Sequence, residues 1–449
     1  MGILFGTDGI RGLANTYPIT CEVALKTGQG IGFFTKENGH AAVIIGKDTR
    51  ISGDMLESAL AAGVASTGID VLLAGVIPTP GVAYLCSIVK NAGAGIVISA
   101  SHNPYQDNGI KIFKAGGEKL SDKQEDKIED YILNSDNVPQ GKVGKIAVIS
   151  DSLKKYADFL LTKFPLRKPN RRLKLIIDCS NGAASEISHL VFNDTFFDAQ
   201  FLFDYPDGKN INKACGSQHT NELQRRVLLD KADIGIAFDG DADRLIAVDE
   251  KGNEITGDRI LAICAKFAIQ RGKLNNNIVV STIMSNIGLS KMLGSVGIQH
   301  IKSDVGDRKV LEQMKKSGAV IGGEDSGHII FLDIHTTGDG MLSALKLLEV
   351  MIETKESLSS LAAVMTVYPQ VLKNVEVPKS CQDLMENKLI VDTIKAVEHK
   401  LDGKGRVLIR YSGTQPLLRV MVEGPDQGLI DQYCISICDS IKAVIKDEL

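Results

Sequence analysis

The sequence predicts an α/β fold of four domains: three related α/β domains with mixed sheets and a smaller C-terminal α+β domain. The chain has 449 residues, too many for one ordinary hydrophobic core, since domains average about 150 residues. A strand, turn, helix and strand pattern recurs three times, and the C-terminal tail departs from it. The composition, 44% hydrophobic and 24% charged with 44 glycines, is typical of a loop-rich α/β enzyme and argues against disorder.

The recurring block begins with a short β-branched run, continues through a turn into an amphipathic stretch, and ends in a second apolar run. The first runs are 42–45, 173–177 and 278–281, the amphipathic stretches 54–67, 182–193 and 286–295, and the second runs 69–73, 198–203 and 298–301. Breaks fall near 136–145, 252 and 368–378. We therefore expect domains over residues 1–145, 146–253, 254–367 and 368–449.

The C-terminal tail has a different pattern. Residues 407–424 are typical of a strand, a loop and a second strand, and residues 427–446 of an amphipathic helix. This order predicts the small α+β domain that closes the chain.

Charge, hydropathy and cysteine content argue against a nucleic-acid-binding, membrane or disulfide-bonded protein. The net charge is −4 and no basic block occurs, which disfavours a nucleic-acid partner. No apolar run approaches the roughly 18 residues of a membrane helix, and the N-terminus lacks a signal-peptide pattern. The eight cysteines form no CxxC pair, as in reduced proteins of the cytosol. We expect a cytoplasmic monomer or homodimer that acts on a small molecule and contacts neither nucleic acid nor membrane.

An acidic segment, DGDADR, follows the apolar run 234–238. On a strand its three aspartates would lie too far apart to share one cation, so we expect a loop, which Gly240 and Ala242 permit. Converging carboxylates suit Mg²⁺. A calcium loop is one alternative, with ligands at positions 1, 3, 5 and 12, although Arg244 stands where that loop needs glycine; a solvated acidic turn is another. The proposed magnesium ligands are Asp239, Asp241 and Asp243, and the calcium loop would add Glu250.

In the segment SASHNP, residues 99–104, Ser101 follows an apolar run and precedes His102. No acid lies nearby to complete a hydrolase triad, but Ser101 can still carry a phosphoryl group if a metal loop neutralises the charge. The alternative is an ordinary N-cap or turn serine. Lys111 could contact that phosphate or relay a proton, although a single lysine is more often a solvated surface charge.

Two further loops have the residue types that hold anions and sugar hydroxyls. RYSGTQPLLR (410–419) combines two guanidinium groups with hydroxyls around a glycine, which suits a phosphate dianion. GGEDSGH (322–328) offers donors and acceptors suited to vicinal hydroxyls, with a plain β-turn as the alternative. The candidate residues are Arg410, Ser412, Gly413, Thr414 and Arg419 in the first loop, and Glu324, Ser326 and His328 in the second.

Together these segments resemble the α-D-phosphohexomutase family. The resemblance rests on FGTDGIRG (5–12), SASHNP (99–104), DGDADR (239–244), GGEDSGH (322–328) and RYSGTQP (410–416), in order along the chain. PDGKNINKACGS (206–217), SNIGL (285–289), DVGDRKV (304–310) and TTGDG (336–340) are similar to the branch that acts on glucosamine phosphates. The resemblance therefore spans all four expected domains, and it implies that they surround a central cleft.

The resemblance implies a role for each candidate residue. Ser101 would be the phosphoserine and a metal ligand, beside one Mg²⁺ per subunit held by the three aspartates. Arg11, His102 and Lys111 would be catalytic neighbours of that phosphate. Arg244 would support the metal loop and contact the substrate, the 322–328 loop would bind the sugar, and the 410–419 loop the substrate phosphate. Gln415 and Asp325 depart from the family's usual Glu and Gln, and they bear on substrate preference rather than chemistry.

The implied reaction interconverts glucosamine 6-phosphate and glucosamine 1-phosphate. It would pass through a phosphoserine enzyme, with glucosamine 1,6-bisphosphate as intermediate and activator, and would serve UDP-N-acetylglucosamine biosynthesis. Three alternatives stay open. They are a phosphoglucomutase or phosphomannomutase of the same family, a metal-dependent phosphatase, and a non-enzymatic phosphosugar sensor.

Overall fold

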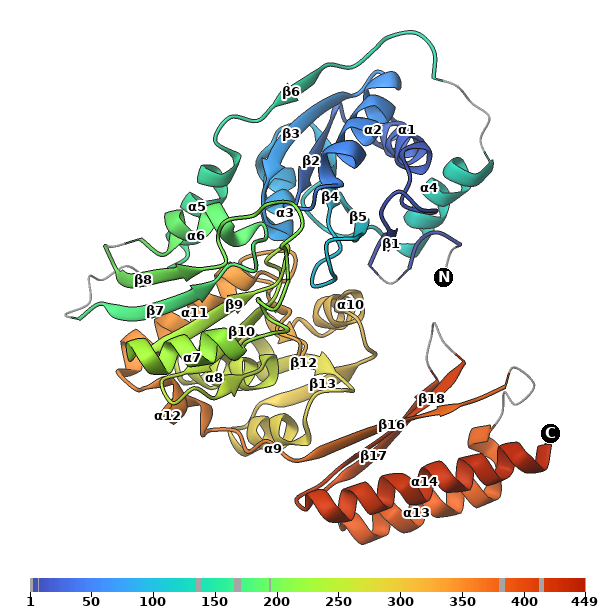
Figure 1. The fold of residues 1–449 in the computed structure, drawn as a ribbon, viewed down its shortest axis with the longest axis vertical. Coiled ribbons are helices and arrows are strands. Elements are labelled where there is room, and N and C mark those ends of the chain that lie inside the picture. Colours follow the sequence, from blue (N-terminus) through green and yellow to red (C-terminus); the bar gives the residue numbers. More distant parts are fainter. Residues whose placement is uncertain are drawn as a thin grey trace. The chain divides into compact units, whose positions relative to one another are not determined.

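The structure, a computed structural model, describes residues 3–6, 8–134, 139–164, 171–193, 195–378, 384–411 and 416–448 (Figure 1). Backbone contacts divide the chain into two compact units. The first comprises residues 1–284 and 296–364, and the second comprises residues 285–295 and 365–449.

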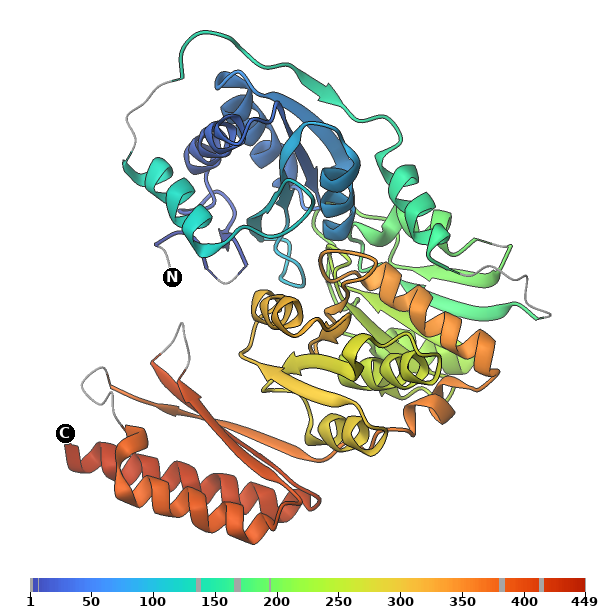
Figure 2. The same cartoon turned by 180° about the vertical axis from the view of Figure 1, so that it is seen from behind.

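The first unit begins with a six-stranded mixed sheet covered on both faces. Its strands, in sheet order, are β1 (Ile10–Leu13), β5 (Asp107–Lys114), β4 (Ala92–Ile98), β2 (Ala42–Lys47), β3 (Asp70–Val76) and β6 (Ile146–Val148). Its helices are α1 (Cys21–Glu37), α2 (Gly53–Ser66), α3 (Thr79–Ile88) and α4 (Asp122–Asn134). Val43 and Ile45 pack in one core with α1 and α2, which lie side by side (Figures 1 and 2). A Cβ at Gly46, the residue after Ile45, would point to the opposite face and meet Val82 of α3, because side chains alternate across a sheet.

The last strand of this sheet follows the residue at which we expected the first domain to end. β6 pairs in parallel with β3, with Val71 opposite Ile146. The turn-rich composition of residues 136–145 therefore precedes the final strand instead of marking the end of the sheet.

The second sheet of the first unit has five strands. In order they are β11 (Glu254–Ile255), β10 (Leu245–Asp249), β9 (Ile234–Phe238), β7 (Leu173–Asp178) and β8 (Phe197–Leu202), with helices α5 (Ser152–Thr162), α6 (Ala184–Val191) and α7 (Asn221–Asp230). β11 pairs with β10, so this sheet also runs past the expected boundary at residue 253. A two-residue strand is too short to show period-two alternation in sequence.

The third sheet has four strands and completes the first unit. They are β13 (Gln299–Ser303), β12 (Ile278–Thr282), β14 (Ile321–Gly323) and β15 (Ile329–Phe331). The associated helices are α8 (Gly257–Gln270), α10 (Asp307–Ser317), α11 (Gly340–Thr354) and α12 (Leu358–Ala362), with a 3₁₀ turn at Asn275–Asn277.

The predicted repeat is present in all three mixed sheets. The amphipathic stretches correspond to α2, α6 and α9 (Ile287–Ser295), each between two parallel strands. Each sheet then adds an antiparallel hairpin: β4–β5, β9–β10 or β14–β15. The loops of these hairpins contain SASHNP, DGDADR and EDSGH, so three of the predicted functional segments occupy the same topological position.

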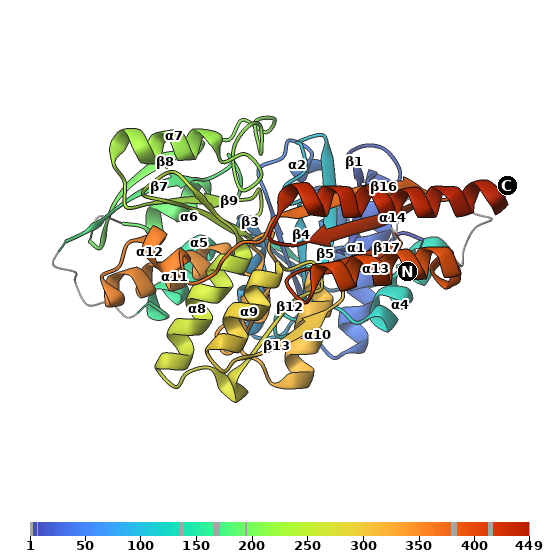
Figure 3. The ribbon, with the colours of Figure 1, turned by 90° about the horizontal axis from the view of Figure 1, so that it is seen from below.

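The second unit contains the predicted smaller α+β domain together with α9. β16 (Gln370–Glu376), β18 (Leu417–Glu423) and β17 (Arg406–Tyr411) form an antiparallel sheet in that order. α13 (Lys388–Leu401) and α14 (Gln427–Glu448) lie side by side and pack with the sheet in one apolar core (Figures 1 and 3), and a 3₁₀ turn spans Leu384–Glu386. The two strands and the helix predicted within residues 407–446 are confirmed as β17, β18 and α14.

Two observations bear on the expected class of protein. Of the seven cysteines in the described ranges, Cys21 is exposed, the other six are buried, and none forms a disulfide. In the described part of the chain, every helix is too short or too polar to cross a membrane.

Candidate active site

Ser101 lies in the hairpin loop after β4 and is 1% exposed. Its φ of +53° is the left-handed conformation, which costs a residue with a Cβ roughly 1–3 kcal/mol. Its Oγ donates a hydrogen bond to Oδ2 of Asp239 over 2.5 Å and lies 3.3 Å from Nδ1 of His102. Burial, with Arg244 and Arg11 nearby, lowers the pKa of His102 to about 4, so this imidazole is neutral at pH 7.

The three predicted metal ligands lie in the hairpin loop between β9 and β10. Asp239, Asp241 and Asp243 are buried, and each offers an oxygen within 4.8 Å of the others. The loop curls as expected, with Ala242 at φ +54°. A Cβ at Gly240 would lie 2.5 Å from the carbonyl oxygen of Ser101, so glycine permits the close approach of the two loops.

The donor set fits a hard divalent cation. Oδ1 of Asp241 and Oδ1 of Asp243 are buried and accept no hydrogen bond from the described residues. Burial, together with the neighbouring charges of Asp243 and Asp241, raises the pKa of Asp239 well above its usual range, because three clustered carboxylates repel one another. Mg²⁺ binds such oxygen ligands while keeping positions open for phosphate and water.

The calcium-loop alternative does not fit. Glu250, which would be its twelfth ligand, follows the whole of β10 and instead accepts hydrogen bonds from the amide and hydroxyl of Ser359. The extended strand carries this carboxylate away from the aspartates.

Lys111 is 3% exposed and not the surface charge that a single lysine usually is. From β5, its Nζ donates to Oδ2 of Asp241 at 2.8 Å and lies 3.2 Å from Asp8 and 3.4 Å from Asp243. Burial disfavours its charge, but Asp241 and Asp8 outweigh burial and raise the pKa of Lys111 well above its usual range. In this arrangement Lys111 is a fixed cation.

Asp8 extends this cluster and is a residue that sequence reasoning missed. It pairs with Arg11, Lys111 and Lys119, and Lys119 in turn pairs with Asp307 at the start of α10. Burial opposes ionisation of Asp8, but the lysines and Arg11 lower its pKa well below its usual range. Nε of Arg11 is buried and has no acceptor within the described ranges. Asp8 and Asp307 lie in the motifs FGTDGIRG and DVGDRKV, and membership of these motifs was the sequence signal that could have identified them.

The loop predicted to bind the sugar joins β14 to β15. Oε1 of Glu324 accepts a hydrogen bond from the amide of Gly306 at 3.1 Å. Oγ of Ser326 is buried and has no hydrogen-bond partner in the part of the chain that the structure describes. Glu324 and Ser326 therefore retain polar atoms that are not committed to the protein's own packing.

His328 lies against the metal loop. Its Nδ1 is 3.6 Å from Asp243 and its Nε2 is 3.7 Å from Asp307. Burial opposes protonation, yet Asp243 and Asp307 raise the pKa of His328. The backbone holds the two loops together, since the amide of Leu245 donates to the carbonyl of Gly327 at 3.0 Å.

Asp325, one of the two departures from the family pattern, contacts the start of α8. It is exposed, its Oδ1 accepts a hydrogen bond from the amide of Asp258, and its carbonyl accepts one from Gly257. Asp325 therefore caps the N-terminus of α8, a role in which a carboxylate is favourable.

Arg244 closes the metal loop. Its Nε lies 3.8 Å from Asp243 and 4.0 Å from Asp239, and its own amide donates to Asp239 at 3.2 Å. Burial opposes the charge of Arg244, but Asp243 and Asp239 raise its pKa.

In the second unit, Arg410 and Arg419 face each other across β17 and β18. Their Nε atoms are buried, and neither has an acceptor among the described residues. Burial and the neighbouring Arg419 lower the pKa of Arg410, as expected for paired cations without an anion. Ser412, Gly413, Thr414 and Gln415 lie outside the described residues.

Comparison with protein families gives a match over nearly the whole chain. Four domain models match in order: alpha/beta/alpha domain I over residues 2–139, domain II over 154–252, domain III over 256–368 and the C-terminal domain over 372–440. The chain belongs to the phosphoglucomutase/phosphomannomutase family. It is therefore an enzyme of the phosphohexomutase class, whose members are isomerases.

Curated relatives agree with this assignment. A protein of Desulforapulum autotrophicum named phosphoglucosamine mutase is 58% identical over 98% of this chain and 99% of its own length. One of Syntrophobacter fumaroxidans with the same name is 50% identical over 99% of this chain and all of its own length.

Solved structures share the fold. A phosphoglucomutase/phosphomannomutase family protein from Burkholderia thailandensis superposes with a TM-score of 0.83 at 24% identity, covering 98% of this chain and 97% of that one. N-acetylphosphoglucosamine mutase of Aspergillus fumigatus, solved with GlcNAc-6P and magnesium, has a TM-score of 0.72 at 16% identity, covering 99% and 96%.

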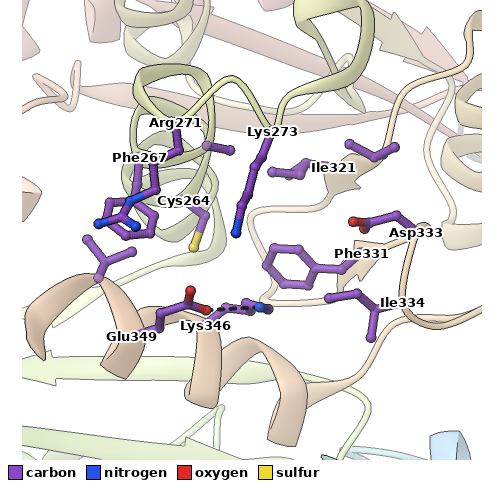
Figure 4. Close-up of a pocket in the computed structure, with 13 residues that line it drawn as sticks. Cys264, Phe267, Arg271, Lys273, Ile321, Phe331, Asp333, Ile334, Lys346 and Glu349 are labelled. Carbon is purple, nitrogen blue, oxygen red and sulfur yellow. Dashed lines mark hydrogen bonds and ion pairs between the residues drawn. The ribbon is translucent and has the colours of Figure 1, made fainter. Parts of the chain in front are cut away.

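An apolar pocket of this phosphohexomutase lies apart from the candidate site residues. It lies between α8 and α11, lined by side chains such as Cys264, Phe267 and Phe331, with a Lys346–Glu349 ion pair at its edge (Figure 4). None of the described site residues lines it.

Proposed function

We propose that this enzyme interconverts glucosamine 6-phosphate and glucosamine 1-phosphate, with Ser101 as the phosphoryl carrier and glucosamine 1,6-bisphosphate as the intermediate. The observation that carries the proposal is the hydrogen bond from Ser101 Oγ to Asp239 within a buried triad of carboxylates. The names of the 58% and 50% identical relatives support the choice of substrate. The product would supply UDP-N-acetylglucosamine synthesis.

In the proposed cycle, the bond from phosphorus to Ser101 Oγ breaks as a bond to the free sugar hydroxyl forms. The hydroxyl loses its proton and Ser101 Oγ regains one. The bisphosphate then turns over and returns its other phosphoryl group to Ser101 by the reverse exchange. Ser101 needs no hydrolase triad for this, because its phosphoryl group is what reacts.

The chain's charged residues organise the transfer. The three aspartates would hold Mg²⁺, which when bound neutralises charge on the transferring phosphoryl group. Lys111 is held beside them as a permanent cation, and Arg11 has a buried Nε still able to donate. His102 is neutral at pH 7 and adds no charge beside Ser101.

The paired guanidinium groups of Arg410 and Arg419 would bind the substrate's non-reacting phosphate. Glu324 is the carboxylate proposed to contact the ammonium group at the sugar's C2. A charge-assisted hydrogen bond there favours glucosamine phosphates over glucose phosphates by roughly ten- to a hundredfold.

The test compares glucosamine, glucose and mannose phosphates in a coupled mutase assay, with mass spectrometry of the enzyme. We expect the highest kcat/KM with glucosamine phosphates and a partial addition of about 80 Da, the mass of a phosphoryl group, at Ser101. Ser101→Ala should lose turnover by several orders of magnitude. Exposed Ser58 on α2 provides the matched control, Ser58→Ala, with unchanged turnover. A fully active Ser101→Ala enzyme would refute the mechanism, and a preference for glucose or mannose phosphate would refute the substrate.

A further inference from the structure

We infer that Arg50 is a positioning residue for Ser101: its guanidinium, assisted by Asn212, holds Ser101 in the conformation that aims its Oγ at Asp239. The inference rests on the proposed function, in which Ser101 carries the phosphoryl group. Arg50 follows β2 and touches no reacting atom of that step.

All five N–H bonds of the Arg50 guanidinium have acceptors. Nε donates to Oδ2 of Asp48 at 2.8 Å. The four terminal N–H bonds donate to backbone carbonyls of the β4–β5 loop and the first residue of β5: Ser101 at 2.9 Å, Asn103 at 2.8 Å, Asp107 at 3.0 Å, and Pro104. The Arg50 side chain is fully buried. A single planar group therefore fixes the path of the backbone through the SASHNP loop and beyond.

The partner of Arg50 fixes the other side of Ser101. Oδ2 of Asp48 accepts a hydrogen bond from Oγ of Ser99 at 2.6 Å, and that Oγ accepts one from the amide of Ser101 at 2.9 Å. The amide and the carbonyl of Ser101 are thus both tied to one buried ion pair.

The conformation held in this way is an uncommon one. Ser101 has φ +53°, and a residue with a Cβ keeps such a conformation only where its surroundings impose it. If the backbone relaxed to negative φ, the Cα–Cβ bond would point elsewhere and the 2.5 Å contact to Asp239 would be lost. The contacts of Arg50 and its partner Asp48 therefore set the direction of the reacting oxygen.

Asn212 supplies a second attachment from the PDGKNINKACGS segment. Its Nδ2 donates to the carbonyl of Ser101 at 2.8 Å and to that of Asn103 at 2.9 Å. The Ser101 carbonyl accepts from both Arg50 and Asn212, using both of its lone pairs. The conformation of Ser101 thus depends on residues that flank the first and second sheets.

The test uses Arg50→Lys and Asn212→Ala, with Arg226→Lys as the control. Lysine keeps the charge beside Asp48, but its compact ammonium has three donors and cannot span four carbonyls. Arg226 pairs with Asp230 on α7 and contacts none of the site residues named above. Asn212 is half-buried and bears no charge, so Asn212→Ala remains informative if Arg50→Lys fails to fold.

Two measurements are made on each protein. Steady-state kinetics uses the hexose phosphate that the wild type converts fastest. Hydrogen exchange of the backbone amides of residues 99–108 is measured on the metal-free, unphosphorylated protein. We expect Arg50→Lys to lower kcat about a hundredfold, the cost of misplacing a reacting group by about 1 Å, with KM changed less than about threefold. Exchange in 99–108 should accelerate in Arg50→Lys and, to a smaller extent, in Asn212→Ala, and stay unchanged in Arg226→Lys.

The inference is overturned if Arg50→Lys keeps wild-type kcat. It is also overturned if hydrogen exchange in residues 99–108 is unaltered in both Arg50→Lys and Asn212→Ala. A wild type that converts no hexose phosphate would instead contradict the proposed function. The exchange measurement does not depend on turnover, so it still decides whether Arg50 holds the loop.

Discussion

The Oγ of Ser101 donates a hydrogen bond to Asp239 over 2.5 Å, although the two residues are 138 positions apart and lie in hairpin loops of different sheets. The contact joins the only conformationally unusual residue of SASHNP to the first carboxylate of DGDADR.

Asp241→Asn should lower the affinity for Mg²⁺ by about a hundredfold and lower kcat in parallel, because an amide carries no negative charge. A chelator should abolish wild-type activity, Mg²⁺ should restore it, and Ca²⁺ should bind with little turnover because of its looser geometry. Calorimetric titration of Mg²⁺ measures the affinity. Glu250→Gln is the matched control and should bind Mg²⁺ like the wild type, since Glu250 is committed to Ser359. Undiminished turnover by the metal-stripped wild type would contradict the metal assignment.

Glu324→Gln should reduce kcat/KM about tenfold more with glucosamine phosphates than with glucose phosphates, because it removes the charge opposite the sugar ammonium. Asp325→Asn should change both sugars equally or not at all, since Asp325 caps α8. Steady-state kinetics of both variants with both sugars checks this. Equal losses for Glu324→Gln would leave Glu324 as a hydroxyl ligand only.

Gly240→Ala should separate the two loops. Its Cβ would lie 2.5 Å from the Ser101 carbonyl oxygen, a backbone atom that cannot rotate away, so we expect kcat to fall by roughly a hundredfold. Gly294→Ala, on α9, is the control because its Cβ would meet nothing within 4 Å. That change should leave kcat unaltered and stabilise the helix by about 0.5–1 kcal/mol. Wild-type kcat in Gly240→Ala would show that the close approach is dispensable.

His335 should make the first unit sensitive to mild acid. It is buried, with its ring 5.6 Å from that of Phe159, and burial lowers its pKa from 6.5 to about 4. Below pH 6.5 the unfolded chain binds a proton that the folded chain does not, so this stability is present above pH 6.5 and is lost as the pH falls toward 4. Between about pH 7.5 and about pH 5 the loss should be about 2 kcal/mol.

Urea unfolding at both pH values measures the effect of His335. His335→Leu should show a smaller acid dependence than the wild type, by that amount. His219→Gln, at an exposed position, should retain the wild-type dependence. Equal acid dependence in His335→Leu and the wild type would exclude His335 as its source.

Local sequence patterns determined the elements of this protein and the residue types of its site. Short β-branched apolar runs predicted β2, β7 and β12, amphipathic stretches predicted α2, α6 and α9, and the clustered aspartates predicted a loop and not a strand. These features depend on neighbours within about ten residues, so the sequence contains the information needed to predict them. The sequence patterns did not predict β6 and β11, two short edge strands whose existence depends on a partner strand.

Only the tertiary structure decided which residues meet. Nothing near Lys111 in sequence shows that Asp8 and Asp241 surround it, and nothing near Asp325 shows that it caps α8 while Glu324 does not. In the sequence Arg50 resembles any other arginine in a loop. Only the folded structure places the carbonyls of residues 101–107 around its guanidinium group. Buried charges and backbone carbonyls require hydrogen-bond or ion-pair partners. Because these partners come from hairpin loops of two different sheets, the packing of the loops determines which residues meet.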